Sequence, residues 1–495
     1  MRVHDASRGG GPPALPRFLP VRLGAVSWLV PAGLAAEVLG QARLEAGAEG
    51  PARRLRLLPP LLGVYFTLGL CLFSHLPYRE VLRGLAGAPP APASTALTGL
   101  RRRLGPRPFE LLFARVAGHL SPGTAPWSHA CGLLLAAWDG TTLALPASEE
   151  NAAWAGGASR VPRYPRARLV ALAACGTRCL IAAAAGPFRT GERALAATLT
   201  GHLRPGMLLL ADRGFYSWSL WHAAAATGAH LLWRVPGSLH LPVIRALPDG
   251  SWLTRIDDPY HKQLRYHRAT KNRVRRTGRP PETGPLPGAL TVRVIEFTVT
   301  VTADDGTART ERYRMITTLL DCRAAPAAEL AAAYARRWAI ETCFAELKAR
   351  LRGPGRVLRS RTPDLALQET WAYLVTYQAI RAVIARAAAG VGADPARLSF
   401  TTALTAVRAT AARHPADALA HADAAILAAP VPARPGRVRP RALREPGPAY
   451  PSLKTAPGPI ARHATYTITI TPTGAPTHTP GNQRKHPTAT ANQPP

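Results

Sequence analysis

The chain has 495 residues, with 62 Lys and Arg against 29 Asp and Glu, which gives a net charge of +33. A chain of this length can bury two or three hydrophobic cores, so its size does not limit the fold. The positive excess attracts polyanions and leaves DNA, RNA and anionic membrane surfaces as candidate partners. The longest apolar run, Leu61 to Phe73, is too short to span a bilayer, which needs about 20 residues. No membrane partner is therefore expected.

The cysteines are scattered along the chain without a paired framework, and the first residues lack the apolar segment of a secretory leader. Both features favour a reducing cytoplasm over an oxidising compartment. We therefore predict a cytoplasmic protein.

The first part of the chain is predicted to be helical. Residues 1–20 are rich in Gly and Pro and are expected to be disordered, whereas residues 21–125 show helical patterns and form an N-terminal domain. The basic run Arg101 to Arg103 is placed in a Pro-rich loop of this domain. It is either a solvated cluster or a patch that contacts phosphates.

Residues 126–236 change to short apolar strands and helices, in the order strand, strand, strand, helix, strand, helix, strand. This order predicts an α/β fold with a mixed sheet that is buried on both faces. A β-rich insertion follows at 237–322, and the strongly helical segment 323–390 completes the core. Residues 391–430 are predicted to be helical. The tail 431–495 is Pro-rich and almost without acids, so disorder is expected there.

Two aspartates are placed at strand ends. Asp139 lies in WDGTT and Asp212 lies in LLLADRGFYS, each directly after an apolar run. Strand ends in α/β sheets are where catalytic groups collect, because their backbone is fixed while their side chains reach a crevice. An Asp before Gly is also a common turn former, so neither residue alone indicates catalysis.

A third carboxylate comes from the predicted helix AYARRWAIETCFAELKARL. At about 100° per residue, four polar residues form one stripe that borders the apolar face. They are Tyr334, Arg337, Glu341 and Lys348. A helix of this kind can pack on the sheet and still direct a carboxylate at Asp139 and Asp212. The alternative is an ordinary amphipathic helix with a Glu–Arg pair, and Glu346, which lies off the stripe, is not assigned to the site.

Three carboxylates suit hard divalent cations, which prefer oxygen ligands. Two Mg²⁺ ions, for which Mn²⁺ can substitute, could activate a nucleophile and stabilise the leaving oxygen of a phosphodiester. Arg337 and Lys348 would then neutralise nearby phosphates.

The motifs DGT, ADRGFYS and Y-x2-R-x3-E-x6-K resemble the signatures of DDE transposases of the insertion-sequence-4 family, and the similarity covers about residues 20–390. The resemblance implies an RNase H-like catalytic domain with a β-rich insertion before the glutamate. It implies that Asp139, Asp212 and Glu341 are the catalytic metal ligands. It also implies that Tyr334, Arg337 and Lys348 contact the terminal phosphate of double-stranded DNA, with a homodimer bound to paired element ends. Glu149 and Glu150 fall where the family pattern is followed loosely and receive no role.

The densest basic segment, between His261 and Arg279, is nearly free of acids, and Tyr260 and Tyr266 lie beside and within it for stacking. It is interpreted as a DNA-contacting loop, with a solvated loop as the alternative. The residues assigned to DNA contact are Lys262, Arg265, Arg268, Lys271, Arg273, Arg275 and Arg276. Trp218 is a further candidate for DNA contact, by stacking on an extruded base, although core packing is the more ordinary role for Trp218 and Trp221.

The sequence therefore predicts a transposase that cleaves element ends and joins them to target DNA. Two alternatives stay open, a transposase-derived DNA-binding protein that no longer catalyses and a metal-dependent nuclease or resolvase of the same fold.

Overall fold

The computed structural model describes residues 21–47, 58–88, 90, 92–121, 123, 125–156, 164–274, 286–303, 306, 308–431 and 464–472. Within residues 268–274 only the backbone is described. The segment 1–20, which was expected to be disordered, lies outside these ranges.

The N-terminal part is helical, as predicted. Its helices are α1 (Val26–Leu29), α2 (Ala32–Glu45), α3 (Pro60–Leu72), α4 (Tyr78–Arg83), α5 (Ser94–Leu104) and α6 (Arg107–Val116). Helix α3 is apolar nearly all round and is buried against α13 (Pro363–Gly390). The basic run lies on α5 and not in a loop. Arg101 is 1% exposed and donates to Gln368 Oε1 (2.9 Å) and Ser360 Oγ (2.9 Å), so it holds α5 against the core.

The α/β core contains five strands whose order confirms the predicted fold class. They are β2 (Leu133–Ala144), β3 (Arg166–Ala174), β4 (Leu180–Pro187), β5 (Met207–Ala211) and β6 (His230–Arg234). Their spatial order is β4-β3-β2-β5-β6. The pairs β2–β3 and β3–β4 are antiparallel, whereas β2–β5 and β5–β6 are parallel. This is the strand order of an RNase H-like sheet.

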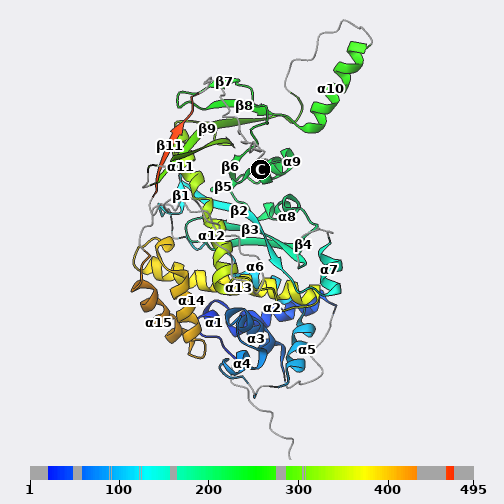
Figure 1. The fold of residues 1–495 in the computed structure, drawn as a ribbon, viewed down its shortest axis with the longest axis vertical. Helices are drawn as coiled ribbons and strands as arrows, with labels where there is room; N and C mark the ends of the chain where they lie inside the picture. The colour runs from blue at the N-terminus through cyan, green and yellow to red at the C-terminus, as the bar shows by residue number, and fades with distance from the viewer. Residues whose placement is uncertain are drawn as a thin grey trace, which may run out of the picture.

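The insertion extends the same sheet. It comprises β7 (Arg245–Ala246), β8 (Trp252–Ile256), α10 (Pro259–Val274), β9 (Leu290–Ala303) and β10 (Ala308–Thr317). Strand β10 pairs antiparallel with β6, so that core and insertion share one 11-stranded sheet. The basic segment between β8 and β9 is helix α10 over its described part and not the predicted loop, since no Pro or Gly interrupts residues 260–274. Figure 1 shows α10 projecting from the insertion end of the molecule.

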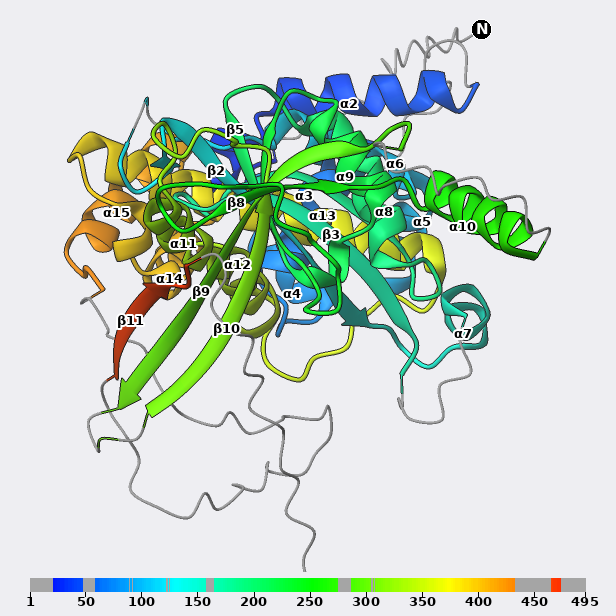
Figure 2. The same ribbon diagram turned by 90° about the horizontal axis from the view of Figure 1, so that it is seen from above.

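Helices cover both faces of the core sheet. One face carries α8 (Glu192–Thr198) and α9 (Trp218–Ala225), and the other carries α11 (Ala327–Ala335), α12 (Trp338–Ala345) and α13. A π-helix (Glu346–Leu351) continues α12, and α7 (Glu149–Ala155) lies between β2 and β3. The last helices, α14 (Phe400–Ala409) and α15 (Pro415–Leu427), pack at the end of α13 (Figures 1 and 2).

Side chains on β2 alternate between these two faces, as strand geometry requires. Leu135 and Ala137 belong to the core cluster under α12 and α13, whereas Ala136 and Trp138 belong to the cluster under α8 and α9. The same alternation continued by two residues puts Asp139 on the α12 face.

One part of the tail departs from the predicted disorder. Ala464–Ile470 form β11, which pairs antiparallel with β9 from Phe297 to Ala303 (Figure 1). The sequence ATYTITI is rich in β-branched residues, and this local β propensity together with the available edge of β9 explains the strand. Residues 432–463 and 473–495 lie outside the described part. Among the described residues no helix is long and apolar enough to cross a membrane.

Removing β11 is expected to loosen the outer part of β9. Deletion of residues 464–495 should raise hydrogen–deuterium exchange at alternate amides of Thr298–Ala303, because these residues pair with β11 on the side away from β10. Deletion of residues 473–495 keeps the strand and serves as the control. Equal protection of β9 in the two truncated proteins would show that β11 does not pair there in solution.

Candidate active site

Asp139 and Asp212 are brought together by the parallel pairing of β2 with β5. Leu134 pairs with Met207 and Ala137 with Leu210. The same register continued by two residues sets Asp139 beside Asp212. Asp212 follows the last residue of β5, as predicted. Asp139 does not end its strand, because β2 continues to Ala144 along β3; it lies where the pairing with β5 ends.

The carboxyl group of Asp139 is largely withdrawn from water. Its side chain is 23% exposed, and burial raises its pKa to about 6. The Gly140 N–H, which donates to Asp139 Oδ1 over 2.8 Å, and the Arg337 guanidinium oppose this rise, while the carboxylates of Glu341 and Glu192 add to it. Asp139 therefore lies in a site that favours a further positive partner.

The carboxyl group of Asp212 also favours a positive partner. Its Oδ1 atom is buried and has no hydrogen-bond partner among the described residues. A buried carboxylate oxygen without a donor is costly. The position is therefore suited to a ligand that brings a positive charge.

Arg337 forms the link between Glu341 and Asp139. The Arg337 side chain is 8% exposed, and its Nη2 donates to Glu341 Oε1 over 2.9 Å, while Nη1 lies 3.8 Å from Asp139 Oδ2. Burial lowers the pKa of Arg337, but Tyr334 and the carboxylates of Glu341, Asp212 and Asp139 outweigh it and raise the pKa. The Arg337 guanidinium thus lies between Glu341 and Asp139, and the charge of Asp212 also acts on it.

The stripe prediction assumed one continuous α-helix, but the segment around Glu341 is divided into three helical elements. Helix α11 ends at Ala335, α12 begins at Trp338, and a π-helix follows from Glu346. The wider π turn changes the angle per residue, so the predicted stripe does not extend unchanged to Lys348. Lys348 still meets the site, because its Nζ donates to Thr141 Oγ1 over 2.9 Å.

Tyr334 lies in the core beside the site and not on an open polar stripe. It is 5% exposed, and its hydroxyl donates to the carbonyl of Ala211, the residue before Asp212, over 3.4 Å. Its ring packs edge-on against Tyr313 with centroids 6.1 Å apart. Tyr334 therefore fixes the end of β5.

Sequence reasoning missed Glu192, a fourth carboxylate near Asp139. It lies in the first turn of α8, on the opposite face of the sheet, and Arg168 is 3.6 Å away. A Cβ added at Gly140 would come within 2.6 Å of Glu192 Cδ, so the glycine of the DGT motif allows this approach. No spacing rule in the sequence marks Glu192, since α8 and β2 meet only in the fold.

The other predicted DNA contacts lie away from the carboxylates. Lys262 and Arg265 are on α10, where Tyr260 and Tyr266 are 64% and 70% exposed. The backbone of α10 also carries Arg268, Lys271 and Arg273, whereas Arg275, Arg276 and Arg279 lie outside the described residues.

The two tryptophans of α9 differ in their surroundings. Trp218 is half-buried and stacks on His222 with ring centroids 5.0 Å apart. Trp221 is 1% exposed within the core. These contacts support core packing for Trp221 and leave the DNA role of Trp218 as a prediction.

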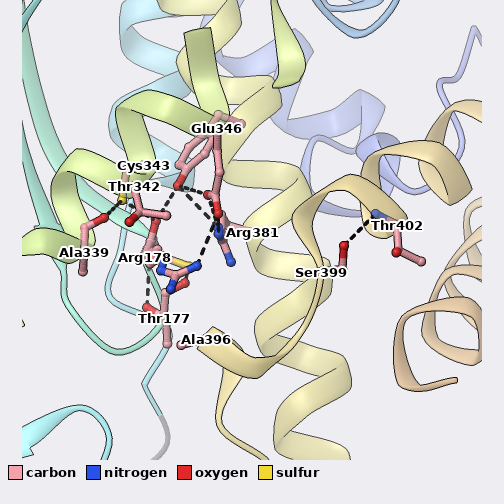
Figure 3. Close-up of polar contacts among 12 residues, drawn as sticks. Thr177, Arg178, Ala339, Thr342, Cys343, Glu346, Arg381, Ala396, Ser399 and Thr402 are labelled. Carbon is pink, nitrogen blue, oxygen red and sulfur yellow. Dashed lines mark hydrogen bonds and ion pairs between the residues drawn. The ribbon is translucent and has the colours of Figure 1, made fainter. Parts of the chain in front are cut away.

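A buried cluster of ion pairs holds the π-helix that follows α12. Glu346 Oε2 accepts from Arg381 Nε (3.0 Å) and the Tyr377 hydroxyl (3.1 Å), and Glu346 Oε1 accepts from Arg178 Nη1 (3.3 Å). Arg381 is fully buried. Figure 3 shows Glu346 facing Arg178 and Arg381, so the π-helix is joined to α13 and to the turn after β3.

Comparison with known proteins now decides the family. Residues 132–378 match the profile of the transposase DDE domain, and residues 20–114 match the N-terminal profile of insertion element 4 transposases. This chain belongs to the insertion-sequence-4 family of DDE transposases. The resemblance predicted from the motifs is thereby confirmed.

Two relatives come from Escherichia coli (strain K12). The transposase InsG for insertion sequence element IS4 is 27% identical over 364 residues, which cover 70% of this chain and 75% of that protein. The putative transposase InsZ is 31% identical over 148 residues, which cover 29% of this chain and half of that protein. Among solved structures, a piggyBac transposase synaptic complex with hairpin DNA matches over 78% of each chain, with 10% identity and a TM-score of 0.40.

Removing the charge of Glu346 should destabilise the protein strongly. Glu346→Gln is expected to lower the free energy of unfolding by about 3–5 kcal/mol, because Arg381 would stay buried without its partner. Urea denaturation measures this loss. Glu37→Gln is the matched control, since Glu37 is exposed and 3.9 Å from Arg115, and it should change the stability by less than about 0.5 kcal/mol. Similar losses in both variants would contradict a special role for the buried cluster.

Proposed function

We propose that the protein is an active DNA transposase that cleaves the ends of an insertion element and joins them to target DNA by metal-dependent phosphodiester hydrolysis and transesterification. The observation that carries the proposal is that Arg337 joins Glu341 of the helix to Asp139, while the register of the two parallel strands brings Asp212 beside Asp139. Membership of the transposase family supports it.

The residues fit a divalent cation, although they do not form a closed metal site by themselves. In the described part of the chain, no three acid, histidine or cysteine side chains are arranged so that they could hold an ion together. Arg337 lies between Asp139 and Glu341, and Asp212 keeps an unpaired buried oxygen. Carboxylate oxygens are the ligands that Mg²⁺ and Mn²⁺ prefer, so Asp139, Asp212 and Glu341 would hold the metal. Bound there, it would activate the attacking water or 3′-hydroxyl and stabilise the leaving oxygen.

The cationic residues around the acids would position the DNA end. Lys348 is half-buried, and burial, followed by the charges of Arg352 and Arg166, lowers its pKa. A phosphate beside Lys348 would reverse this effect, because an anion stabilises the ammonium form. Arg337 could turn from the carboxylates to a phosphate once a cation neutralises them. Tyr334, which holds the end of β5, completes the set proposed to contact the terminal phosphate.

The proposed partner is double-stranded DNA, as element ends and as target. Helix α10 carries basic residues and exposed tyrosines at the insertion end of the molecule. Such a helix can contact the phosphate backbone. We further propose that two copies assemble on paired ends and that the protein acts in the cytoplasm on nucleoid DNA.

A catalytically silent DNA-binding protein is the alternative. Such a protein would still need the positive charge of α10 to bind DNA. It would not need a carboxylate at Asp212, whose buried oxygen lacks a hydrogen-bond donor among the described residues. The presence of all three acids at one end of the sheet favours the active enzyme.

Substitution of the acids tests the catalytic assignment. Asp139→Asn and Glu341→Gln should each reduce cleavage of duplex DNA carrying the element ends in Mg²⁺ by about 1,000-fold, because each removes a metal ligand. Both variants should bind DNA at least as well as the parent, since each removes a negative charge. Glu149→Gln, an exposed acid on α7, is the control. Cleavage that survives in either variant would refute the assignment, and a parent protein that binds but never cuts would favour the silent alternative.

Neutralising α10 should weaken DNA binding without changing the chemistry. The double variant Lys262→Gln, Arg265→Gln should lower the slope of log affinity against log salt by about 0.9 for each phosphate that the helix no longer neutralises. The rate of cleavage at saturating DNA should stay the same. Titrations at several salt concentrations measure the slope. An unchanged slope would mean that α10 faces solvent in the complex.

A further inference from the structure

A cationic cavity lies apart from the three carboxylates, between the N-terminal domain and the core. Its volume is about 460 Å³. The loop 74–77 after α3 forms one wall, the segment 352–359 after the π-helix forms the other, and Tyr373 of α13 also lines it. The cavity therefore joins two parts of the chain that are far apart in sequence.

The turn Arg352-Gly353-Pro354-Gly355-Arg356 shapes this cavity. Gly353 has φ +95° and Gly355 has φ +68°, a backbone region that favours glycine. A Cβ added at Gly353 would lie 2.8 Å from Arg356 Nε, so the Arg356 side chain folds back over the glycine. The turn thereby keeps two guanidinium groups at the wall of one cavity.

Arg352 has donors that the described protein does not use. The residue is 8% exposed, yet its Nε and Nη1 atoms are buried without hydrogen-bond partners in the described structure. Burial lowers the pKa of Arg352, and Tyr373 and Glu369 only partly oppose this. A buried unpaired cation is costly, so its natural complement is an anion in the cavity.

The other arginines that line the cavity, Arg356 and Arg359, have structural partners, as does Arg408, whose charge acts on His75. Arg356 Nη1 donates to Ser74 O (3.1 Å), Arg359 Nη1 to Leu76 O (2.7 Å) and Arg408 Nε to Leu72 O (2.7 Å). The bond from Arg408 complements the carboxyl end of α3, and the other two hold the loop that follows it. Each guanidinium has five donors, so the bonds to the carbonyls leave their positive charge available to an anion.

The buried carboxylate of Glu369 does not neutralise the arginines of the cavity. Glu369 is 3% exposed, and its oxygens already accept from the Arg359 backbone N–H (3.0 and 3.1 Å) and the Ser360 hydroxyl (2.6 Å). One carboxylate thus faces several guanidinium groups. The field of the cavity is positive, and it also lowers the pKa of His75 after the effect of burial.

We propose that this cavity binds a phosphate of the DNA backbone and that Arg352 is the residue that recognises it. The DNA source rests on the proposed function. It is favoured over a free anion because Arg352 directly follows the π-helix that carries Lys348, and Lys348 contacts Thr141, two residues from Asp139. A phosphodiester held here would engage the N-terminal domain and the catalytic core together.

The first experiment uses inorganic phosphate and the full chain without DNA. Phosphate should raise the Tm of the parent at constant ionic strength. Arg352→Met should abolish this rise and, in phosphate-free buffer, should keep or increase the Tm, because a buried unpaired charge is removed. The matched control is Arg350→Met, with the same charge change at an exposed arginine on the π-helix that precedes Arg352. A lower Tm of Arg352→Met without phosphate, or an equal phosphate effect in all three proteins, would overturn the proposal. Arg352→Gln, which removes the same charge, should lose the phosphate effect in the same way.

The second experiment identifies the source of the phosphate. Duplex DNA is titrated in EDTA, so that the result does not depend on cutting. Arg352→Met should bind about tenfold more weakly than Arg350→Met, as expected for removal of a charged hydrogen bond, with a salt slope smaller by about 0.9. Disappearance of the phosphate effect with unchanged DNA binding would assign the cavity to a free anion and overturn the DNA proposal. Failure of the proposed function would look different, as a parent protein that shows both effects and does not cut.

Discussion

The parallel pairing of β2 with β5 is the constraint on which the site depends. Two strands that run in the same direction in fixed register put Asp139 and Asp212 side by side, on the face covered by α12. A shift of one residue would turn one acid to the opposite face, because strand side chains alternate. The apolar residues of β2 and β5 specify this register, since both faces of the sheet are buried. The position of the acids therefore follows from the packing of their neighbours.

The glutamate helix needs a second support, because Glu341 comes from a separate segment of the chain. Tyr334 holds the end of β5, Lys348 holds β2 through Thr141, and Glu346 joins the π-helix to Arg381 in α13. These contacts fix the helix from both sides. They leave Arg337 as the cation among the carboxylates, and a metal that binds them would take over that charge.

Arginine serves two different purposes in this strongly basic chain. Arg101 is buried and every nitrogen of its guanidinium has a hydrogen-bond partner, so it acts as a link between the N-terminal helices and α13. Arg352 is also buried but keeps unused donors at a cavity. The same residue type thus supports structure at one position and favours an anion at the other. Hydrogen bonding distinguishes the two roles, whereas burial and composition do not.

The sequence by itself determined the family and the order of strands and helices in the core, because short apolar runs and the Y-x2-R-x3-E-x6-K spacing are local patterns. It also singled out the three acids that are proposed to hold the metal. Tertiary structure decided the rest. It continued β2 beyond Asp139, formed a π-helix where a uniform α-helix was assumed, and paired β11 with β9 in a tail expected to be disordered. It also brought Glu192 near Asp139 and left Arg352 with buried donors that the described residues do not use. These features depend on contacts between segments distant in the chain, and no local pattern records which distant groups will meet.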